Sequence, residues 1–345
     1  MRPHHLTASV VALLTAVVLT ISGVAPAWAA SQHPTGATAR ATPAVLNINK
    51  VTLPETSIDG PALSSLFASN SAYQSVIAWT GTDAAHHLNV ETSANGLDFG
   101  NKLTLNETSP YRPDVTQAAG GLIVVAWTGS DANHSLNVLY DVYGAKPVKL
   151  TLYHENSIAA PAIFQMGAYL FLAWTGTDAN HSLNMLSITY SASSLVPGKK
   201  TVLPQFSSDA GPRLVRSGSS HMVLLWTTRN LRLNLSTTPD GVTFSNTLGA
   251  GLPETSAFAP GADFFAPYVS PTGLDWIGWT GTDAAHHLNL QWGHLLGFTN
   301  PIETKTTLGE TALGGPALAY NAGELVAWTG TDSAHHLNVA RFALS

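Results

Sequence analysis

The stretch WTGTDAAHHLNV, from Trp79 to Val90, returns four more times almost unchanged along the chain. The copies are WTGSDANHSLNV from Trp127, WTGTDANHSLNM from Trp174, WTGTDAAHHLNL from Trp279 and WTGTDSAHHLNV from Trp328, and a clipped sixth copy, WTTRNLRLNL, begins at Trp226. Successive tryptophans lie 47 to 53 residues apart. A period of about 50 residues is typical of propellers and other arrays in which each repeat is one supersecondary unit. The sequence therefore predicts six structural repeats.

Each repeat divides into four β-strands separated by turns rich in Asn, Gly, Ser and Asp, the residues that hairpins favour. In the first repeat we expect strands from Pro61 onward, at 75–80, at 87–92 and at 99–105. The second strand, SVIAWT, is apolar on both faces, which indicates a sheet packed between two neighbours. Six four-stranded antiparallel sheets packed face to face form a six-bladed β-propeller, and we predict this all-β fold.

Several repeated positions have simple structural interpretations. We expect Asn89 and its equivalents to bond to the backbone of a neighbouring strand. The six tryptophans should lie in the core between blades. They are Trp79, Trp127, Trp174, Trp226, Trp279 and Trp328.

The two ends of the repeated region indicate how the ring closes. The sixth repeat stops at Ser345 after its third strand. The segment LNINKVTLPETS at 46–57 matches the ends of fourth strands, such as LTLNETS at 103–109. We therefore expect 46–57 to pair with the C-terminal strand, complete the last blade and close the propeller that occupies 46–345.

The N-terminal region has a different composition. Residues 1–29 have the layout of a secretory signal peptide, with a basic start, an apolar run at 10–24 and small residues before a cleavage site after Ala29. A transmembrane anchor is the alternative interpretation, although the run is short for a bilayer span. Residues 30–45 predict a flexible leader. We expect a secreted, extracellular protein with no membrane span once the signal is removed.

The composition of the 345 residues excludes some chemistry. There is no cysteine, so a disulfide framework and thiolate chemistry are excluded. The formal net charge of −6 argues against nucleic acid as a partner. We predict no cofactor and no metal, because one Asp and one His per loop make a weak ligand set.

The candidate binding residues lie in the loops that follow the tryptophans. In a propeller, the connection from the second to the third strand emerges on the same face as the connection from the fourth strand to the next blade. The loop TGTDxxH and the Glu-Thr-Ser ends of the fourth strands should therefore share one face. The candidates are the Asp and His of five loops: Asp83, His86, Asp131, His134, Asp178, His181, Asp283, His286, Asp332 and His335.

Each of these two residue types also has a structural interpretation. Asp83 can close the hairpin by accepting a hydrogen bond from a backbone amide two residues on. His86 lies in an exposed turn where Asn or Ser would fold equally well, which favours a role in binding. Duplication of a recent ancestor would also preserve it.

Two turns carry a family resemblance. SANGLDF at 93–99 and TPDGVTF at 238–244 resemble the Asp-box turn of sialidase-like propellers, Ser-x-Asp-Gly-x-x-aromatic. The tandem repeat over 46–345 resembles secreted bacterial lectin-like propellers of the same superfamily. In that superfamily the box is a structural hairpin on the face away from the ligand, so the resemblance implies a fold and not an activity.

Three functions are compatible with the sequence. Five near-identical polar loops favour a secreted, non-catalytic, lectin-like protein that binds glycans or glycoconjugates at several equivalent sites, since weak sites gain strength when several are engaged together. The resemblance also implies an alternative, a sialidase-like glycoside hydrolase with one site at the channel mouth near Arg112, Arg213 and Arg229. A structural or protein-interaction scaffold is the third. The fourth repeat, which lacks the Asp and the His, is either a decayed repeat or a separate site, and the oligomeric state stays open.

Overall fold

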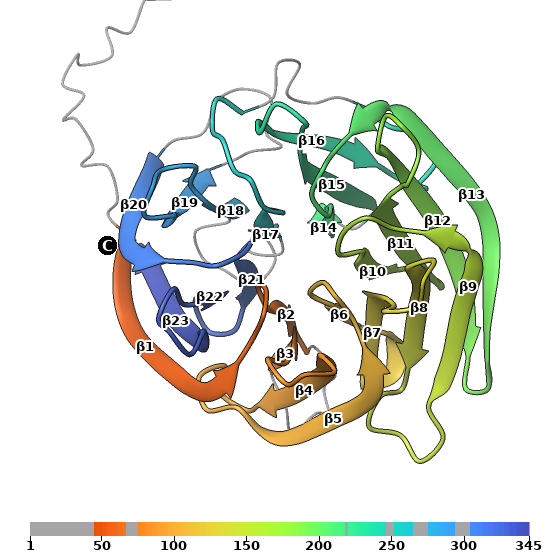
Figure 1. Cartoon of the computed structure of the whole chain (residues 1–345), viewed down its shortest axis with the longest axis horizontal. Coiled ribbons are helices and arrows are strands. Elements are labelled where there is room, and N and C mark those ends of the chain that lie inside the picture. The colour runs from red at the N-terminus through yellow and green to blue at the C-terminus, as the bar shows by residue number, and fades with distance from the viewer. Residues whose placement is uncertain are drawn as a thin grey trace, which may run out of the picture. The chain divides into compact units, whose positions relative to one another are not determined.

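The structure is a computed structural model that describes residues 45–66, 75–217, 220–245, 252–264, 275–293 and 304–344. These residues form six antiparallel β-sheets arranged as a ring (Figure 1), so the predicted six-bladed β-propeller is confirmed. The described part of the chain has one short 3-10 turn, η1 (Ala119–Gly121), and no helix with the length and hydropathy to span a membrane. The predicted signal peptide, and the leader up to residue 44, lie outside the described residues.

The blades follow one another along the chain, and in the first five blades the strands run in chain order from the axis outward (Figure 1). In blade 6 the outermost strand is β1, the first strand of the chain. Blade 1 consists of β2 (Ala62–Ser65), β3 (Ser75–Thr80), β4 (His87–Ser93) and β5 (Gly100–Thr108). Blade 2 consists of β6 (Asp114–Gln117), β7 (Ile123–Thr128), β8 (Ser135–Tyr140) and β9 (Val148–Asn156). Blade 3 consists of β10 (Ala162–Met166), β11 (Tyr169–Thr175), β12 (Ser182–Ser191) and β13 (Ser194–Ser207).

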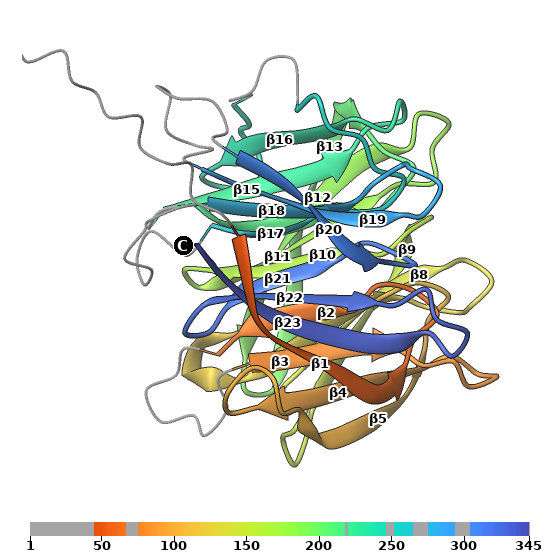
Figure 2. The same ribbon diagram turned by 90° about the vertical axis from the view of Figure 1, so that its left-hand side faces the viewer.

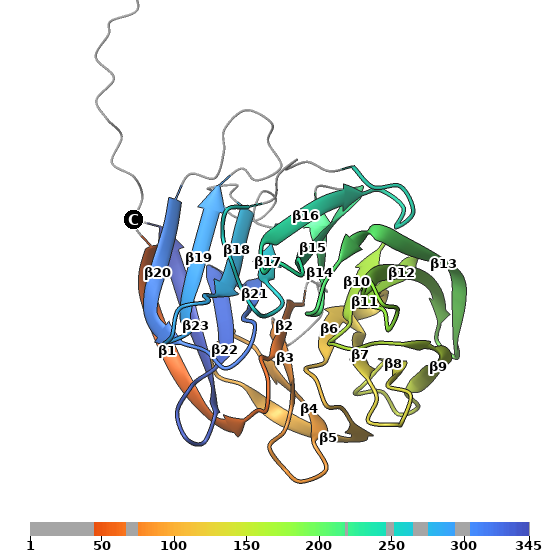
Figure 3. The ribbon, with the colours of Figure 1, turned by 45° about the horizontal axis from the view of Figure 1, so that its top comes forward.

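The second half of the ring repeats this order. Blade 4 contains β14 (Arg213–Ser217), β15 (His221–Thr227) and β16 (Leu233–Thr238). Blade 5 consists of β17 (Gly261–Asp263), β18 (Asp275–Thr280), β19 (His287–Gly293) and β20 (Thr304–Thr311). Blade 6 consists of β21 (Ala317–Tyr320), β22 (Glu324–Thr329), β23 (His336–Leu344) and β1 (Val45–Thr56). Figure 3 shows the blades from a tilted direction.

The first and last strands close the ring as predicted. β1 pairs antiparallel with β23, with Val45 opposite Leu344 and Val51 opposite Val339. Figure 2 shows β1, in orange-red, lying along the blue β23. Blade 6 is therefore built from both ends of the propeller, and strand pairing fastens them together.

The core lies between the blades. Trp79 of blade 1 packs against Leu325, Ala327 and Val339 of blade 6. In the same way Trp127 of blade 2 packs in a cluster with side chains of blade 1. All six repeated tryptophans are at most 1% exposed, which confirms their predicted place in the core between blades.

Hydrogen bonds tie each blade to the next connection. The Thr80 hydroxyl donates to the carbonyl of Tyr111 at 2.7 Å, and the corresponding threonine of each of the other five blades makes the same type of bond. The predicted hydrogen-bond partner of Asn89, the backbone of a neighbouring strand, was wrong. Its amide donates to the carbonyl of His87 in its own strand, and its oxygen accepts from the Thr104 hydroxyl on the next strand.

Candidate functional site

The repeated loops and the ends of the outer strands meet on one face of the ring, called the rim face below. The Thr56 hydroxyl at the end of β1 lies 2.7 Å from the Thr82 hydroxyl in the first loop. The backbone amide of Ser109, just after β5, donates to the carbonyl of His86 at 3.2 Å. Both repeated motifs therefore contribute to the same surface, as the order of the strands predicts.

The repeated aspartates close their own loops. The Asp83 carboxylate accepts from the backbone amides of Ala85 and His87, both at 3.1 Å, and lies 2.7 Å from His87 Nδ1. Burial would raise the pKa of Asp83, but the hydrogen bonds from His87 and Ala85 outweigh it and hold the pKa below its ordinary value. The four equivalents, Asp131, Asp178, Asp283 and Asp332, accept the same kinds of bonds. The aspartates thus have a folding role, and a contact to a ligand stays a prediction.

The glycine of the motif makes room for this carboxylate. A Cβ added to Gly81 would lie 2.8 Å from Asp83 Oδ2 and 3.0 Å from Asn89 Nδ2. The glycines of the other four complete loops are equally crowded. The fourth blade has Thr228 at this position and no aspartate, and there the Thr228 hydroxyl accepts from the Arg232 amide instead. Glycine is therefore required only where the aspartate folds back.

The repeated histidines adopt a left-handed backbone conformation, with φ of 57° at His86 and of 50° to 58° at all five positions. The equivalent residue of the fourth loop, Leu231, has φ of 67°. Since leucine occupies the same conformation, the backbone does not require an imidazole there. Three of the rings contact the connections near the axis, among them His286, whose ring centre lies 5.9 Å from that of Phe258. His134 packs edge-on against Tyr111, and His181 Nδ1 lies 2.5 Å from an oxygen of Asp209.

A second repeated constellation lies at the junctions between blades. Lys200 of β13 places Nζ 5.3 Å from the ring centre of Trp174, and the same Nζ lies 2.5 Å from the Glu155 carboxylate of the preceding blade. Five of the six junctions carry such a pair over a repeated tryptophan. The pairs are Lys50–Glu310, Lys102–Glu55, Lys149–Glu107, Lys200–Glu155 and Lys305–Glu254.

Sequence reasoning missed these lysines. Each of them lies two residues before the repeated Thr or Val of the outer strand, as Lys102 does before Thr104 and Lys200 before Val202. An alignment of the outer strands alone would have found them. Their partners lie 42 to 51 residues earlier, or on the opposite end of the chain for Lys50, so packing of adjacent blades brings each pair together.

The junction of blades 2 and 3 is hollowed into a groove of about 320 Å³. Glu155 and Lys200 line it, together with Thr177 and Asp178 of the loop and His154 of β9. Carboxylate, ammonium, hydroxyl and imidazole groups thus face one open space above a buried indole. Of the predicted loop pair in blade 3, Asp178 lies in the groove, whereas His181 is directed at Asp209.

The junction of blades 3 and 4 is built differently. Phe206 occupies the place where the other junctions have the glutamate, and its ring centre lies 4.5 Å from that of Trp226. Among the described residues of this junction there is no lysine over the tryptophan. An apolar contact has replaced the ion pair, so the ring offers five polar junctions.

The three arginines of the predicted central site occupy three different places. Arg112 is buried at the rim-face end of the axis, in a hollow of about 160 Å³, and donates to the carbonyl of Gly315. Arg213 lines a second cavity among the inner strands and forms an ion pair with Asp114. Arg229 is half-exposed on the rim, 3.4 Å from Asp209. The structure does not bring the three guanidinium groups together around one space.

Comparison with known proteins identifies the fold alone. No family model and no curated protein sequence matches the chain. Among solved structures, a Hadza microbial sialidase has a TM-score of 0.59 at 13% identity, and the match covers 84% of this chain and 65% of that one. A mutant Aleuria aurantia lectin in complex with Fucα1-6GlcNAc has a TM-score of 0.58 at 10% identity, over 86% and 96% of the two chains. The BP39L lectin from Burkholderia pseudomallei has a TM-score of 0.55 at 12% identity, over 83% and 81%. The chain therefore resembles sialidase-like and lectin propellers, as predicted.

Proposed function

We propose that this protein is a secreted, non-catalytic carbohydrate-binding propeller whose sugar sites are the five polar junctions between adjacent blades, with the groove between blades 2 and 3 as the example. The observation that carries the proposal is the repeated set of glutamate, lysine and tryptophan at five of the six junctions. The scaffold needs neither charge at this place, because the junction of blades 3 and 4 packs with Phe206 instead. Because the polar pair is present at five junctions and folding does not need it at the sixth, we infer that the pair serves ligand binding.

The chemistry of the groove suits a sugar. Glu155 accepts hydrogen bonds, Lys200 donates them, and Thr177 does both, so adjacent hydroxyls of one pyranose can be satisfied together. Charge-assisted hydrogen bonds of this kind are stronger than neutral ones. Val202 lines the same groove and is 53% exposed, so it offers an apolar contact to the C–H face of the ring.

The arrangement of several sites around one ring increases the overall affinity for a glycan. A single shallow site binds one sugar weakly, whereas several sites on one rigid ring can engage a branched or clustered glycan at once. The similarity in fold to lectin propellers, one of them in complex with Fucα1-6GlcNAc, supports this assignment. The predicted aspartates take part as neighbours of the groove, with Asp178 as the example.

The test is a glycan array followed by calorimetric titration of the best glycan fragment. The substitution Lys200→Met keeps the aliphatic stem over Trp174 and removes the donor, so the stoichiometry should fall from five sites to four. The matched control is Lys199→Met, which removes the same charge from the neighbouring exposed position of β13. A flat array, or equal effects of the two substitutions, would refute the proposal.

An activity assay on the same protein preparation distinguishes the sialidase alternative from the binding proposal. A fluorogenic sialoside should remain intact, because Arg112, Arg213 and Arg229 do not surround a common space. Turnover of the sialoside that disappears with Arg213→Ala would replace the binding proposal with an enzymatic one.

A further inference from the structure

The groove between blades 2 and 3 differs from the other four polar junctions at one pair of facing residues. In blades 1, 2, 5 and 6 the repeated asparagine lies opposite a threonine of the outer strand, and the threonine hydroxyl donates to the asparagine Oδ1 at 2.6 to 2.7 Å. The pairs are Asn338–Thr52, Asn89–Thr104, Asn137–Thr151 and Asn289–Thr307. In blade 3 the register is the same, but Asn184 lies opposite Val202. Because valine has no hydroxyl, the donor is missing from this one of the five blades.

The missing donor leaves an amide oxygen without a partner in the groove. Asn184 is only 4% exposed, and it lines the groove. Its Nδ2 donates to the carbonyl of Ser182 at 2.9 Å, which determines which end of the amide carries the oxygen. Among the described residues no group donates a hydrogen bond to Asn184 Oδ1. A largely buried acceptor without a donor costs free energy, so a donor on a bound ligand is stabilising at this place.

The valine also places an apolar surface beside this oxygen. Val202 is 53% exposed and lines the same groove as Asn184. Residues directly opposite each other on antiparallel strands have Cβ atoms about 4.5 to 5.5 Å apart on one face of the sheet. One ligand group can therefore reach both side chains if it combines a hydrogen-bond donor with an apolar end. Lys200 and Glu155 do not enter this choice, because each of them already has the other as its partner.

The groove is open at the rim, where other junctions are bridged. At three polar junctions a threonine at the end of one blade lies 2.6 to 2.9 Å, hydroxyl to hydroxyl, from a threonine in the loop of the next. These pairs are Thr56–Thr82, Thr255–Thr282 and Thr311–Thr331. Asn156 and Thr177 hold these positions in the groove and line it, with no hydrogen bond between them in the part of the chain that the structure describes. The volume of about 320 Å³ lies at the lower end of the range of about 300 to 1,000 Å³ for small-molecule sites.

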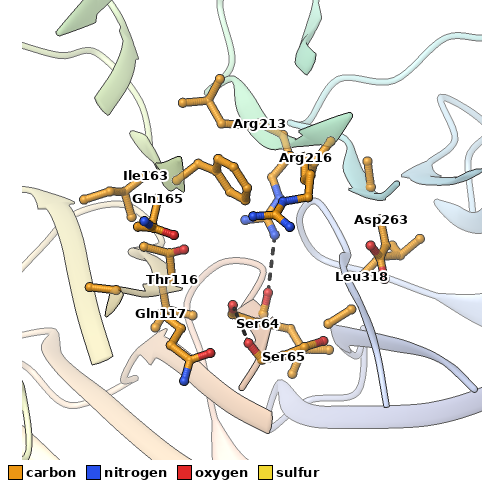
Figure 4. Close-up of a pocket in the computed structure, with 18 of the residues that line it drawn as sticks. Ser64, Ser65, Thr116, Gln117, Ile163, Gln165, Arg213, Arg216, Asp263 and Leu318 are labelled. Carbon is orange, nitrogen blue, oxygen red and sulfur yellow. Dashed lines mark hydrogen bonds between the residues drawn. The ribbon is translucent and has the colours of Figure 1, made fainter. Parts of the chain in front are cut away.

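The cavity on the axis of the ring, called the axial cavity, offers a contrast (Figure 4). There Arg213 pairs with Asp114 and donates to the carbonyl of Leu63, and the Ser65 hydroxyl donates to the carbonyl of Tyr320. These bonds join inner strands of different blades. Asn184 Oδ1 joins nothing, so the groove is the better candidate for recognition of a specific ligand.

We propose that the groove between blades 2 and 3 is selective for an N-acetylated hexosamine, whose acetamido N–H donates to Asn184 Oδ1 while its acetyl methyl packs on Val202. This inference rests on the proposed carbohydrate-binding function and names the sugar class for one of the five sites. An acetamido group joins an N–H donor to a methyl group through one carbonyl carbon, so it supplies both features that distinguish this groove. A hydroxyl in its place could donate to Asn184 but would leave Val202 facing water. At the other four junctions a threonine already occupies the acceptor, so the selectivity is confined to one site.

Calorimetric titration of the full-length protein with two matched pairs of sugars tests the proposal. N-acetylglucosamine is compared with glucose, and N-acetylgalactosamine with galactose. At one site per chain, at least one acetamido sugar should bind about tenfold more tightly than its parent hexose, because it adds a hydrogen bond and buries a methyl group. Val202→Thr supplies the donor that four other blades carry, so the two sugars of the pair should then bind about equally.

Two further variants isolate the cause. Val196→Thr is the matched control, because Val196 is also 53% exposed on β13 but does not line the groove, and this variant should keep the preference. Thr151→Val removes the donor from Asn137 in blade 2, so a second acetamido-selective site should appear. Circular dichroism and the melting temperature report the folding of each variant.

The outcomes separate this inference from the function on which it rests. If sugars bind but the acetamido and parent sugars bind equally, the inference is overturned and the carbohydrate-binding function stands. The same holds if Val202→Thr keeps the preference, if Val196→Thr removes it, or if Thr151→Val adds no second site. If no sugar binds, both proposals are overturned.

Discussion

Replacing Gly81 with alanine tests the central claim about the repeated loop, which is that glycine makes room for the aspartate. The new Cβ would lie 2.8 Å from Asp83 Oδ2, a separation that real Cβ atoms do not adopt. The backbone at Gly81 does not have positive φ, so the effect is steric and not conformational. Relief requires the Asp83 carboxylate to move, and the bonds to the amides of Ala85 and His87 are then lost.

The magnitude follows from these bonds. Each is worth about 1 kcal/mol net, and the Asp83 side chain is 44% exposed, so solvent screening places the pair at about 1 to 2 kcal/mol in total. Alanine also restricts the unfolded chain, which returns about 0.4 to 1 kcal/mol. Gly309→Ala is the matched control, because nothing lies within 4 Å of its added Cβ. We expect Gly81→Ala to be less stable than the control by about 1 to 2 kcal/mol.

Urea unfolding followed by tryptophan fluorescence measures both variants, and a double-mutant cycle isolates the cause. In an Asp83→Ala background the clashing oxygen is absent, so Gly81→Ala should cost little beyond the residual contact with Asn89. If Gly81→Ala costs the same with and without the aspartate, or no more than Gly309→Ala, the steric account of the motif is wrong.

Three further predictions concern the blades. Glu324 has both carboxylate oxygens buried without a hydrogen-bond partner among the described residues, and burial, then Asp263, raises its pKa well above 4.5. As the pH rises, the carboxyl of the unfolded chain loses its proton before the buried carboxyl does, so Glu324 lowers stability above about pH 4.5. Glu324→Gln should therefore raise the urea midpoint at pH 8 more than at pH 4, and equal changes of the midpoint would contradict this. Deletion of 45–56 removes the closing strand, so gel filtration and circular dichroism should show loss of the folded monomer, whereas a monomer with unchanged melting would refute closure. Lys102→Met should change the unfolding free energy by less than about 1 kcal/mol, since a partly exposed ion pair contributes little; a larger loss would indicate that the pair is structural.

The fold could be predicted because each repeat of the sequence contains the strand pattern of one blade. The period, the apolar second strands and the match of 46–57 to the outer strands lead to six blades and a ring closed by β1, and all of this is confirmed. The same repetition fixed the place of the tryptophans. Each is a large apolar side chain at a position whose neighbours are apolar on both faces, so burial between blades was the consistent interpretation.

The site was less predictable, for two physical reasons. The first is that one residue type serves two roles: Asp83 was considered both as a loop closure and as a ligand contact, and only the geometry shows the closure. The second is that the lysine–glutamate pairs form between different blades. Lys102 contacts Glu55, 47 residues away. The glutamate was recognised as part of the repeated Glu-Thr-Ser ends, but its lysine partner was not. Contacts that depend on ring geometry are absent from the pattern of a single repeat.

The fourth blade shows how one repeat can diverge both at the rim and at the axis. Its loop has lost the aspartate and the glycine together, which is the expected coupling if the glycine only accommodates the aspartate. Its junction with blade 3 has exchanged an ion pair for the contact of Phe206 with Trp226. At the axis the same blade supplies Arg213 and Arg216 to an asymmetric cavity. Divergence of the fourth blade therefore replaces the charged pair at one junction and adds two arginines to the wall of the axial cavity.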